Sequence, residues 1–472
     1  MTEWPDYSMT NSLQKLFMAL GEQEIKKLFK EVERVAEERG MIYEEDDGTA
    51  RRVPLLLRPR LISLQQKNYF MSVCRHMHDA FLKLSKIYYS TPSLQFLLPF
   101  TPDEHEWFMK YFPQDPKSPH TIIARWDANT NFSGKNWKAS FHFLEVNGVG
   151  VGGLHYSPTS ERIILEIVVN SLRQLDKDLK ICLNDDVRQI LLLELQSHLK
   201  SLGKRRCHIG LIQDDRYKGG PLDFIYLKKF YESQGIKAEV IDPRDLRVKN
   251  GKILGKRIEL DILYRDSMLI ELLDMEKEEG PLKAVRKAFE ENLIVSGLAG
   301  EIDHKSAFEF FSNPEFEKYF SADEIRYFKH HIPWTRLIRE TRTTDPHGKK
   351  VDLVPYAVHH KETLVLKPNR GFGGEGILIG SSSSLHEWES LLAKALQNPG
   401  SYAVQSRCAI RRKKFPMINK HGHIVEKSLN VVCGFIYSNF GLGILGRASM
   451  GNVVNVAQNG GMTTIMICEN RK

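Results

Sequence analysis

The sequence predicts a mixed α/β (α+β) fold, with an N-terminal helical region and strands concentrated toward the C-terminal end. Apolar residues recur at helical spacing over residues 10–40 and again around 60–95. After Arg206, short buried strands alternate with an amphipathic helix, which is typical of a small α/β module with a parallel sheet. Residues 428–456 have the apolar runs and glycine turns of further strands.

Length and composition fit an ordinary globular protein. The chain has 472 residues, of which 42% are hydrophobic and 27% charged, which suggests about two to four domains. The formal net charge of +8 is spread along the chain without a long basic tail. This modest excess fits an anionic small-molecule ligand, and we expect no nucleic-acid partner.

The lack of a visible targeting signal, together with the cysteine usage, predicts a cytoplasmic protein. The six cysteines are scattered and form no C-x-x-C pair, as in reduced, intracellular proteins. The first residues lack a secretory signal, and no apolar run reaches the roughly 18 residues of a membrane span. We therefore expect no membrane association, and nothing in the sequence indicates an oligomeric state.

Shifts in pattern divide the chain into four regions. The first is helical, the second has two strands followed by helices from about Pro158, the third is the α/β module, and the fourth combines helices with the C-terminal strands. We place these regions at 1–118, 119–204, 205–300 and 301–472.

A glycine-rich segment, "LVLKPNRGFGGEGILIG", covers residues 364–380. A β-favouring run ends at Lys367, a glycine-rich turn follows, and apolar character resumes at Ile377. One interpretation is a simple hairpin tip, where glycine permits positive φ. The other is a phosphate cradle, in which backbone N–H groups and the lysine surround a polyphosphate. The glycines of the loop are Gly371, Gly373, Gly374 and Gly376.

Two short motifs place polar side chains on neighbouring strands. "ARWD" contains Arg125 and Asp127, and "LEVNG" contains Glu145 and Asn147. Residues two apart share one face of a strand, so all four side chains converge if the strands pair. Such an oxygen-rich face suits Mg²⁺, which prefers carboxylates and phosphate oxygens. The alternative is a solvated strand face with a surface ion pair.

The order of these motifs resembles the glutathionylspermidine synthetase-like branch of the ATP-grasp ligases. The likeness rests on Arg-x-Asp, Glu-x-Asn, the α/β module and Lys-Pro before the glycine loop, over about residues 120–472. It implies an ATP-grasp fold, with 205–300 as the pre-ATP-grasp module and 301–472 as the nucleotide-binding region. It also implies that Asp127, Glu145 and Asn147 hold magnesium, that Arg125 faces the reacting carboxyl group, and that Lys367 contacts ATP phosphates.

Further positions are predicted with an alternative beside each. Gln405 would meet adenine or be a polar strand residue, and Lys305 would be a second ATP lysine or lie on a solvated helix face. Arg447 and Asn455 would line the site or serve at a core edge or turn. The basic run at 411–414 would face phosphate or substrate, or be solvated.

Together these features predict an ADP-forming, ATP-dependent carboxylate–amine ligase with ATP and Mg²⁺ as cofactors. A carboxylate would attack the γ-phosphate to give an acyl phosphate, and an amine would displace the phosphate. The partners would be a small-molecule acid and a small-molecule amine. Two alternatives stay open: a kinase-like transfer to a hydroxyl group, and a nucleotide-binding scaffold without turnover.

Overall fold

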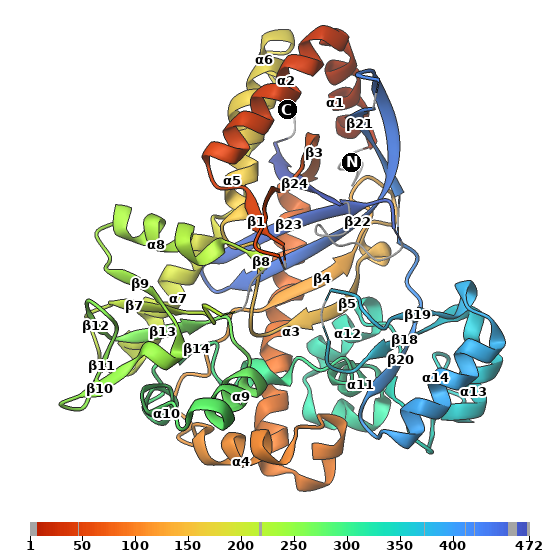
Figure 1. Cartoon of the computed structure of the whole chain (residues 1–472). Helices are drawn as coiled ribbons and strands as arrows, with labels where there is room; N and C mark the ends of the chain where they lie inside the picture. Colours follow the sequence, from red (N-terminus) through yellow and green to blue (C-terminus); the bar gives the residue numbers. More distant parts are fainter. Residues whose placement is uncertain are drawn as a thin grey trace.

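A large, mainly antiparallel sheet forms the centre of the computed structural model, which describes residues 7–45, 47–216, 220–371, 373–410, 412–419, 421–451 and 460–469 (Figure 1). Its strands follow the order β3–β24–β23–β22–β4–β5, with β21 beside β22 and β6 beside β24. The β3–β24 pair is parallel. The strands are β3 (Leu55–Ser63), β4 (Arg125–Asn129), β5 (His142–Asn147), β6 (Ile181–Cys182), β21 (Arg412–Ile418), β22 (Ile424–Ser438), β23 (Gly441–Ser449) and β24 (Gly461–Cys468).

Helices cover both faces of this sheet. The long helix α3 (Leu64–Ser90) contributes fully buried side chains such as Phe70 and Phe81 to one core, which also contains Trp126 and Phe435 of the sheet. A second core lies between β3, β24 and the helices at the top of Figure 1. No helix of the described residues is long and apolar enough to cross a membrane. The other helices here are α1 (Tyr7–Ala19), α2 (Gly21–Glu38), α5 (Tyr156–Ile163), the π-helix η3 (Ile164–Val169), α6 (Asn170–Leu175) and α7 (Val187–Ser201).

The N-terminal region is less purely helical than the sequence predicts. The second helical block begins at Leu64, where Ser63 and Gln66 form a reciprocal capping box. The apolar run before it is strand β3, which joins the central sheet. A second, small sheet is formed by β1 (Ile42–Glu44), β2 (Ala50–Arg52) and β8 (Gly220–Pro221).

The predicted α/β module is confirmed, with a parallel sheet in the order β14–β13–β7–β9. Gly235 ends its amphipathic helix in the left-handed conformation that glycine tolerates, with φ of 77°. A three-stranded hairpin sheet extends from one edge. The elements are β7 (Ile209–Ile212), α8 (Asp223–Ser233), β9 (Ala238–Ile241), β10 (Arg247–Lys249), β11 (Lys252–Leu254), β12 (Glu259–Leu260), β13 (Ile262–Arg265), α9 (Leu269–Glu279), α10 (Lys283–Glu290) and β14 (Ile294–Val295).

A third lobe, at the right of Figure 1, carries the glycine-rich segment on a sheet of order β15–β20–β18–β19. Its own core is built around Trp334 and Trp388. The polar segment 341–355 forms the hairpin β16–β17 and the start of α13. The elements are β15 (Thr335–Leu337), β16 (Arg342–Thr344), β17 (Lys350–Asp352), α13 (Leu353–His359), β18 (Leu364–Pro368), β19 (Leu378–Ile379), α14 (Leu385–Gln397) and β20 (Tyr402–Ser406).

The three lobes meet around short helical turns after the α/β module. A buried ion pair joins Arg265, at the end of β13, to Glu301 in the turn η5 (Leu298–Ile302). Glu301 also accepts the backbone N–H of Leu269 at 2.9 Å, so one carboxylate fixes β13, α9 and η5 together. The remaining helices are α4 (Pro102–Tyr111), α11 (Ala307–Ser312) and α12 (Ala322–His331).

Breaking this ion pair should destabilise the fold strongly. Glu301→Gln leaves the Arg265 guanidinium, which is fully buried, without its counter-ion, and we expect a loss of about 3–5 kcal/mol. Chemical unfolding measures the effect as a lower midpoint. The matched control is Asp323→Asn, which breaks an exposed pair with Arg326 and should change stability by no more than about 0.5 kcal/mol. Equal effects of the two variants would contradict a stabilising role of the Arg265–Glu301 pair.

Candidate active site

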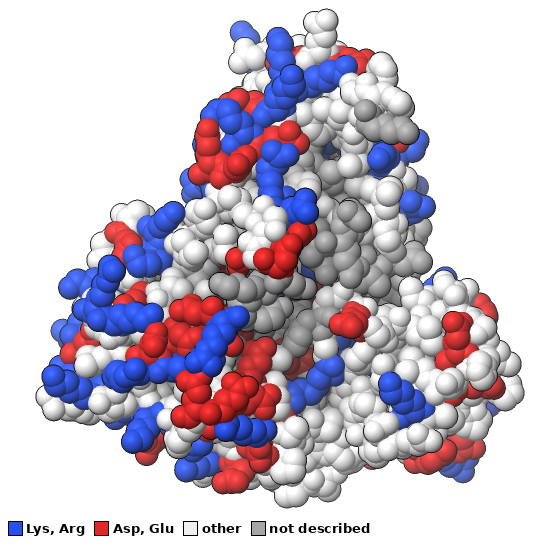
Figure 2. Space-filling view, viewed as in Figure 1, with Lys and Arg blue, Asp and Glu red and all other residues white. Residues whose placement is uncertain are grey.

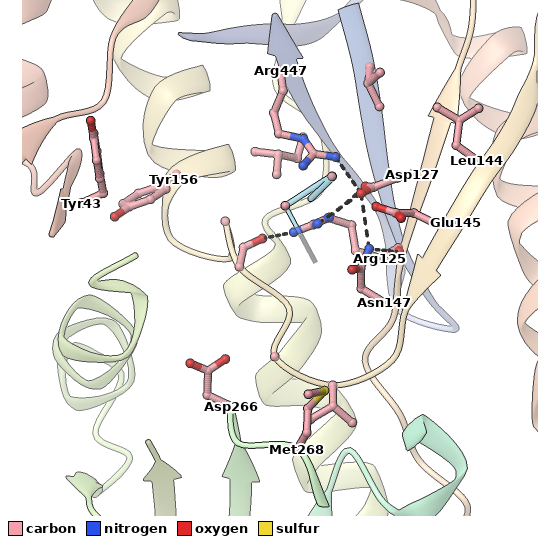
Figure 3. A pocket seen from close by; sticks show the side chains of 18 of the residues that line it. Tyr43, Arg125, Asp127, Leu144, Glu145, Asn147, Tyr156, Asp266, Met268 and Arg447 are labelled. Atoms are coloured by element: carbon pink, nitrogen blue, oxygen red, sulfur yellow. Dashed lines mark hydrogen bonds and ion pairs between the residues drawn. The ribbon is translucent and has the colours of Figure 1, made fainter. Parts of the chain in front are cut away.

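A cavity of about 1290 Å³ lies where the central sheet, the α/β module and the third lobe face one another (Figure 3). One wall is the polar face of β4, β5, β22 and β23. A second wall is β18 with its glycine loop, and a third is the carboxyl edge of the parallel sheet with α9. The predicted residues that line it are Arg125, Asp127, Glu145, Asn147, Lys367, Gly373, Gly374, Gln405 and Arg447.

Strand alternation separates the polar face from the core, as the sequence predicts. β4 and β5 pair antiparallel, with Asp127 opposite Glu145 and Arg125 opposite Asn147. The intervening residues Trp126 and Val146 pair with each other and are buried in the core on the other side. The predicted pairing of the two motifs is therefore confirmed.

Asp127 is the hub of the polar face. Arg125 donates to both carboxylate oxygens of Asp127, at 2.9 Å from Nε and 3.2 Å from Nη2. Arg447 lies 2.7 Å from Oδ2, and the Asn147 amide donates to the same oxygen at 3.3 Å (Figure 3). Burial alone would raise the pKa of Asp127, but the two guanidinium groups hold it well below its ordinary value.

A glycine on the neighbouring strand makes room for this pair. Gly434 of β22 lies opposite Asp127 in the sheet. A Cβ atom at this position would lie 2.6 Å from Cδ of Arg125 and 2.8 Å from Oδ1 of Asp127. The Arg125–Asp127 pair therefore requires the bare backbone of Gly434 beneath it.

The oxygen donors fit a magnesium ion held jointly with phosphate. The Asn147 nitrogen is used in hydrogen bonds to Asp127 and to the backbone carbonyl of Arg125, which directs the amide oxygen elsewhere. The Glu145 carboxylate is 28% exposed and faces the cavity. No group of three or more His, Cys, Asp or Glu in the described residues could hold a metal by itself. One or two carboxylates completed by phosphate oxygens are what Mg²⁺ commonly uses.

Two lysines join the glycine loop to this face. Lys367 Nζ donates to the Leu144 carbonyl at 2.9 Å and to Gln405 Oε1 at 2.8 Å. Lys305 Nζ donates to the Gly371 carbonyl at 2.7 Å and lies 3.3 Å from Glu145 Oε2. Burial lowers the pKa of Lys367, and the nearby Glu145 carboxylate opposes that shift. Lys305 is buried, so the alternative of a solvated helix face was wrong.

The loop itself has the backbone that only glycine adopts readily. The φ angles of Gly371, Gly373, Gly374 and Gly376 are 155°, 67°, 80° and 70°. β18 and β19 flank it as an antiparallel pair, so the predicted hairpin is confirmed. Phe372 lies outside the described residues.

The structure describes some of the further predicted positions and not others. Gln405 is buried on β20, where it accepts from Lys367 and donates to Thr335 Oγ1 at 3.0 Å. The Nε of Arg447 is buried without a hydrogen-bond partner in the described part of the chain. In the basic run, Lys413 contacts Asn131 at 2.7 Å on the outer part of β21. Asn455 and Arg411 lie outside the described residues.

The far wall of the cavity contains residues that sequence reasoning missed. Asp214 follows β7 and Asp266 follows β13, both at the carboxyl edge of the parallel sheet. Loops at that edge commonly form binding sites, which was the available signal. Acidic side chains of α9 gather beside them on the surface (Figure 2). Other missed lining residues are Tyr43, Tyr156, Arg244, Arg407 and Cys408.

Comparison by sequence alone gives no relative, because no family model and no curated protein matches the chain. Structural comparison finds a glutathione synthetase-like effector from Globodera pallida, solved in its apo form. It is 12% identical, with a TM-score of 0.63, over 94% of this chain and 97% of that one. The chain therefore shares the fold of this glutathione synthetase-like structure, and the predicted fold class is confirmed.

A second structure, an ATP-grasp RimK-domain protein from Sphaerobacter thermophilus, is 10% identical with a TM-score of 0.26, over 52% of this chain and 91% of that one.

The polar hub should make stability depend on pH in one direction. Because the folded pKa of Asp127 lies below the unfolded value of about 3.9, its contribution is present above about pH 4 and is lost as the pH falls through the folded pKa. Asp127→Asn should therefore lower the melting temperature at pH 7, with a deficit that shrinks below about pH 4.

Melting curves from about pH 3 to 7 measure this difference. The control is Asp245→Asn, which removes an exposed carboxylate paired with Lys256 and should show a small deficit throughout. A deficit for Asp127→Asn that stays constant with pH would contradict the assigned ion-pair hub.

Proposed function

We propose that this protein is an ADP-forming, ATP-dependent carboxylate–amine ligase, with Mg²⁺ as its metal. The observation that carries the proposal is the meeting of two constellations that are far apart in the chain. The Lys367 ammonium of the glycine hairpin lies 2.9 Å from the backbone oxygen of Leu144, the residue before Glu145. The groups that we propose to bind phosphate and metal therefore line one cavity.

The charges of the site suit a polyphosphate. Four cationic side chains, Arg125, Arg447, Lys305 and Lys367, gather around two carboxylates, Asp127 and Glu145. The orphan Nε–H of Arg447 is a further buried donor that a phosphate or carboxylate oxygen would satisfy. Glu145 and Asn147 would hold Mg²⁺ together with phosphate oxygens, and the metal would supply charge neutralisation during transfer.

The residues divide the reaction between them. Glycine-loop N–H groups and Lys367 would hold the β- and γ-phosphates, with Lys305 closing the loop against Glu145. Arg125 would orient the acid, because a planar guanidinium pairs with carboxylate and phosphate oxygens in bidentate fashion. Asp127 would fix both guanidinium groups in position. In-line placement and charge stabilisation supply the catalysis in such transfers.

We also propose the chemical class of the acid and the amine that the ligase joins. The motif order resembles the glutathionylspermidine synthetase-like branch, and the solved neighbour is named glutathione synthetase-like. Both names point toward acids that are small peptides, joined to small amines. A screen for the substrate pair should measure ADP release for glutathione, dicarboxylic acids and N-acetyl amino acids, each with amino acids or alkyl amines.

Loss of the hairpin lysine should weaken ATP binding. Lys367→Met keeps the length of the side chain and removes its charge-assisted hydrogen bonds, worth about 1.5–3 kcal/mol. We expect the Kd for Mg–ATP, measured by calorimetry, to rise about ten- to a hundredfold. Lys394→Met on the exposed face of α14 is the control. Equal ATP affinity in Lys367→Met and the wild type would remove the phosphate assignment.

Replacing Arg125 by lysine tests the proposed acyl phosphate route. Arg125→Lys should retain much of the ATP binding and lose most of kcat, because a point charge cannot replace the bidentate contact. With an acid carrying oxygen-18 in its carboxyl group, the wild type should release phosphate containing one labelled oxygen. Unlabelled phosphate, or AMP and pyrophosphate as products, would exclude the acyl phosphate route. Phosphate attached to a hydroxyl product would favour the kinase-like alternative.

A further inference from the structure

One carboxylate on the far wall of the cavity has no partner among the residues that the structure describes. Asp266 directly follows β13, and its side chain is exposed to the cavity. Within the described residues it makes no side-chain hydrogen bond or ion pair. The neighbouring acids differ: Asp223 accepts the N–H groups of Gly153 and His155, and Glu271 accepts that of Met268. Asp266 therefore presents a free acceptor to whatever occupies the cavity.

Asp266 and Arg125 both lie against the loop at 150–153, which joins β5 to α5. A Cβ atom at Gly150 would lie 3.3 Å from Asp266 Oδ1. Two residues on, the Gly152 carbonyl accepts a hydrogen bond from Arg125 Nη1 at 2.9 Å. Consecutive Cα atoms are about 3.8 Å apart, so the two loop positions are separated by at most about 7 Å. An amine beside Asp266 and an acid beside Arg125 would therefore both lie next to this short loop, in the same cavity (Figure 3).

The surroundings of Asp266 suit proton transfer near neutral pH. Desolvation by the surrounding protein, with the carboxylates of Asp223 and Glu271 nearby, raises the pKa of Asp266 to about 7. A carboxylate with that pKa is basic enough to take a proton at physiological pH. In this respect it differs from Asp127, whose two arginine partners keep it permanently ionised.

We propose that Asp266 binds the ammonium group of the amine substrate and acts as the general base that deprotonates it. The proposal rests on the proposed ligase function and adds a catalytic residue on the wall opposite the phosphate site. A protonated amine has no lone pair for attack, so it must lose a proton before the new C–N bond forms.

The proposed step balances as follows. The ammonium nitrogen gives one proton to Asp266, and its lone pair then forms a bond to the acyl carbon of the acyl phosphate. The C–O bond to the phosphate breaks, and phosphate leaves with the electron pair. The nitrogen loses a second proton to the departing phosphate, which leaves an amide and hydrogen phosphate. Asp266 returns its proton to solvent through the open cavity.

Hydroxylamine separates this role from the rest of the reaction. It attacks acyl phosphates and is mostly unprotonated at neutral pH, so it needs no base. Asp266→Asn should lose about 10²–10⁴-fold in kcat/KM with an alkyl amine such as ethylamine or 1,3-diaminopropane. It should form hydroxamate from hydroxylamine at close to the wild-type rate, with the same acid from the panel of glutathione, dicarboxylic acids and N-acetyl amino acids.

The pH profile provides a second measurement. Wild-type kcat/KM with the alkyl amine should fall below about pH 7, as Asp266 becomes protonated, and this limb should be absent with hydroxylamine. Asp245→Asn, the same charge change on an exposed, ion-paired residue of the α/β module, should match the wild type with both amines.

The outcomes distinguish the two proposals. Equal losses of Asp266→Asn with both amines, or no loss with either, would overturn the role of Asp266 while leaving the ligase intact. No hydroxamate from the wild type with any acid of the panel would instead contradict the ligase proposal, and the role of Asp266 with it. Asp266→Asn should also melt no lower than the wild type at pH 8, because an uncompensated carboxylate beside Asp223 is removed; a much lower melting temperature would indicate a structural role.

Discussion

The site depends on one buried carboxylate that holds two guanidinium groups. Asp127 comes from β4, Arg447 from β23 and Asn147 from β5, so the hub ties together strands that lie far apart in the sequence. A buried carboxylate without these partners would be costly, and the two arginines without Asp127 would repel each other. The same pairing leaves net positive charge at the end of the cavity where a phosphate or an acid would bind. The fold and the electrostatics of the site therefore depend on the same three side chains, Asp127, Arg125 and Arg447.

The glycine hairpin is connected to this hub through lysines rather than through direct contact. Lys305 is placed by the segment after η5, which in turn depends on the buried Arg265–Glu301 pair. Lys305 then bridges Glu145 and the Gly371 carbonyl. The position of the loop is thus set by interactions that begin in the α/β module.

The sequence predicted those parts of the site that follow local rules. Alternation placed Arg125, Asp127, Glu145 and Asn147 on one face, and glycine spacing placed the hairpin loop. It did not predict that Lys305 is buried, because a lysine is usually solvated and only tertiary contacts decide otherwise. Gly434 was equally invisible, since its importance is the space it leaves for Arg125 and Asp127. Strand β3 was read as part of a helix because its apolar run has no clear period.

On the far wall of the cavity, the sequence predicts the strands but not the contacts of the acidic residues that follow them. Asp214 and Asp266 stand next to strands that the sequence identified correctly, and the carboxyl edge of a parallel sheet is where ligands bind in such folds. The sequence does not show which side chains these acids contact. Asp214 is paired with Arg244, whereas the Asp266 side chain has no partner among the described residues. That distinction emerges only when the chain is folded. It divides the cavity into a cationic end, suited to phosphate and acid, and an end with an uncompensated carboxylate, suited to an ammonium group. The proposed reaction joins an anion to a cation and needs both ends, and Arg125 and Asp266 lie against the same loop, at Gly152 and Gly150, in one cavity.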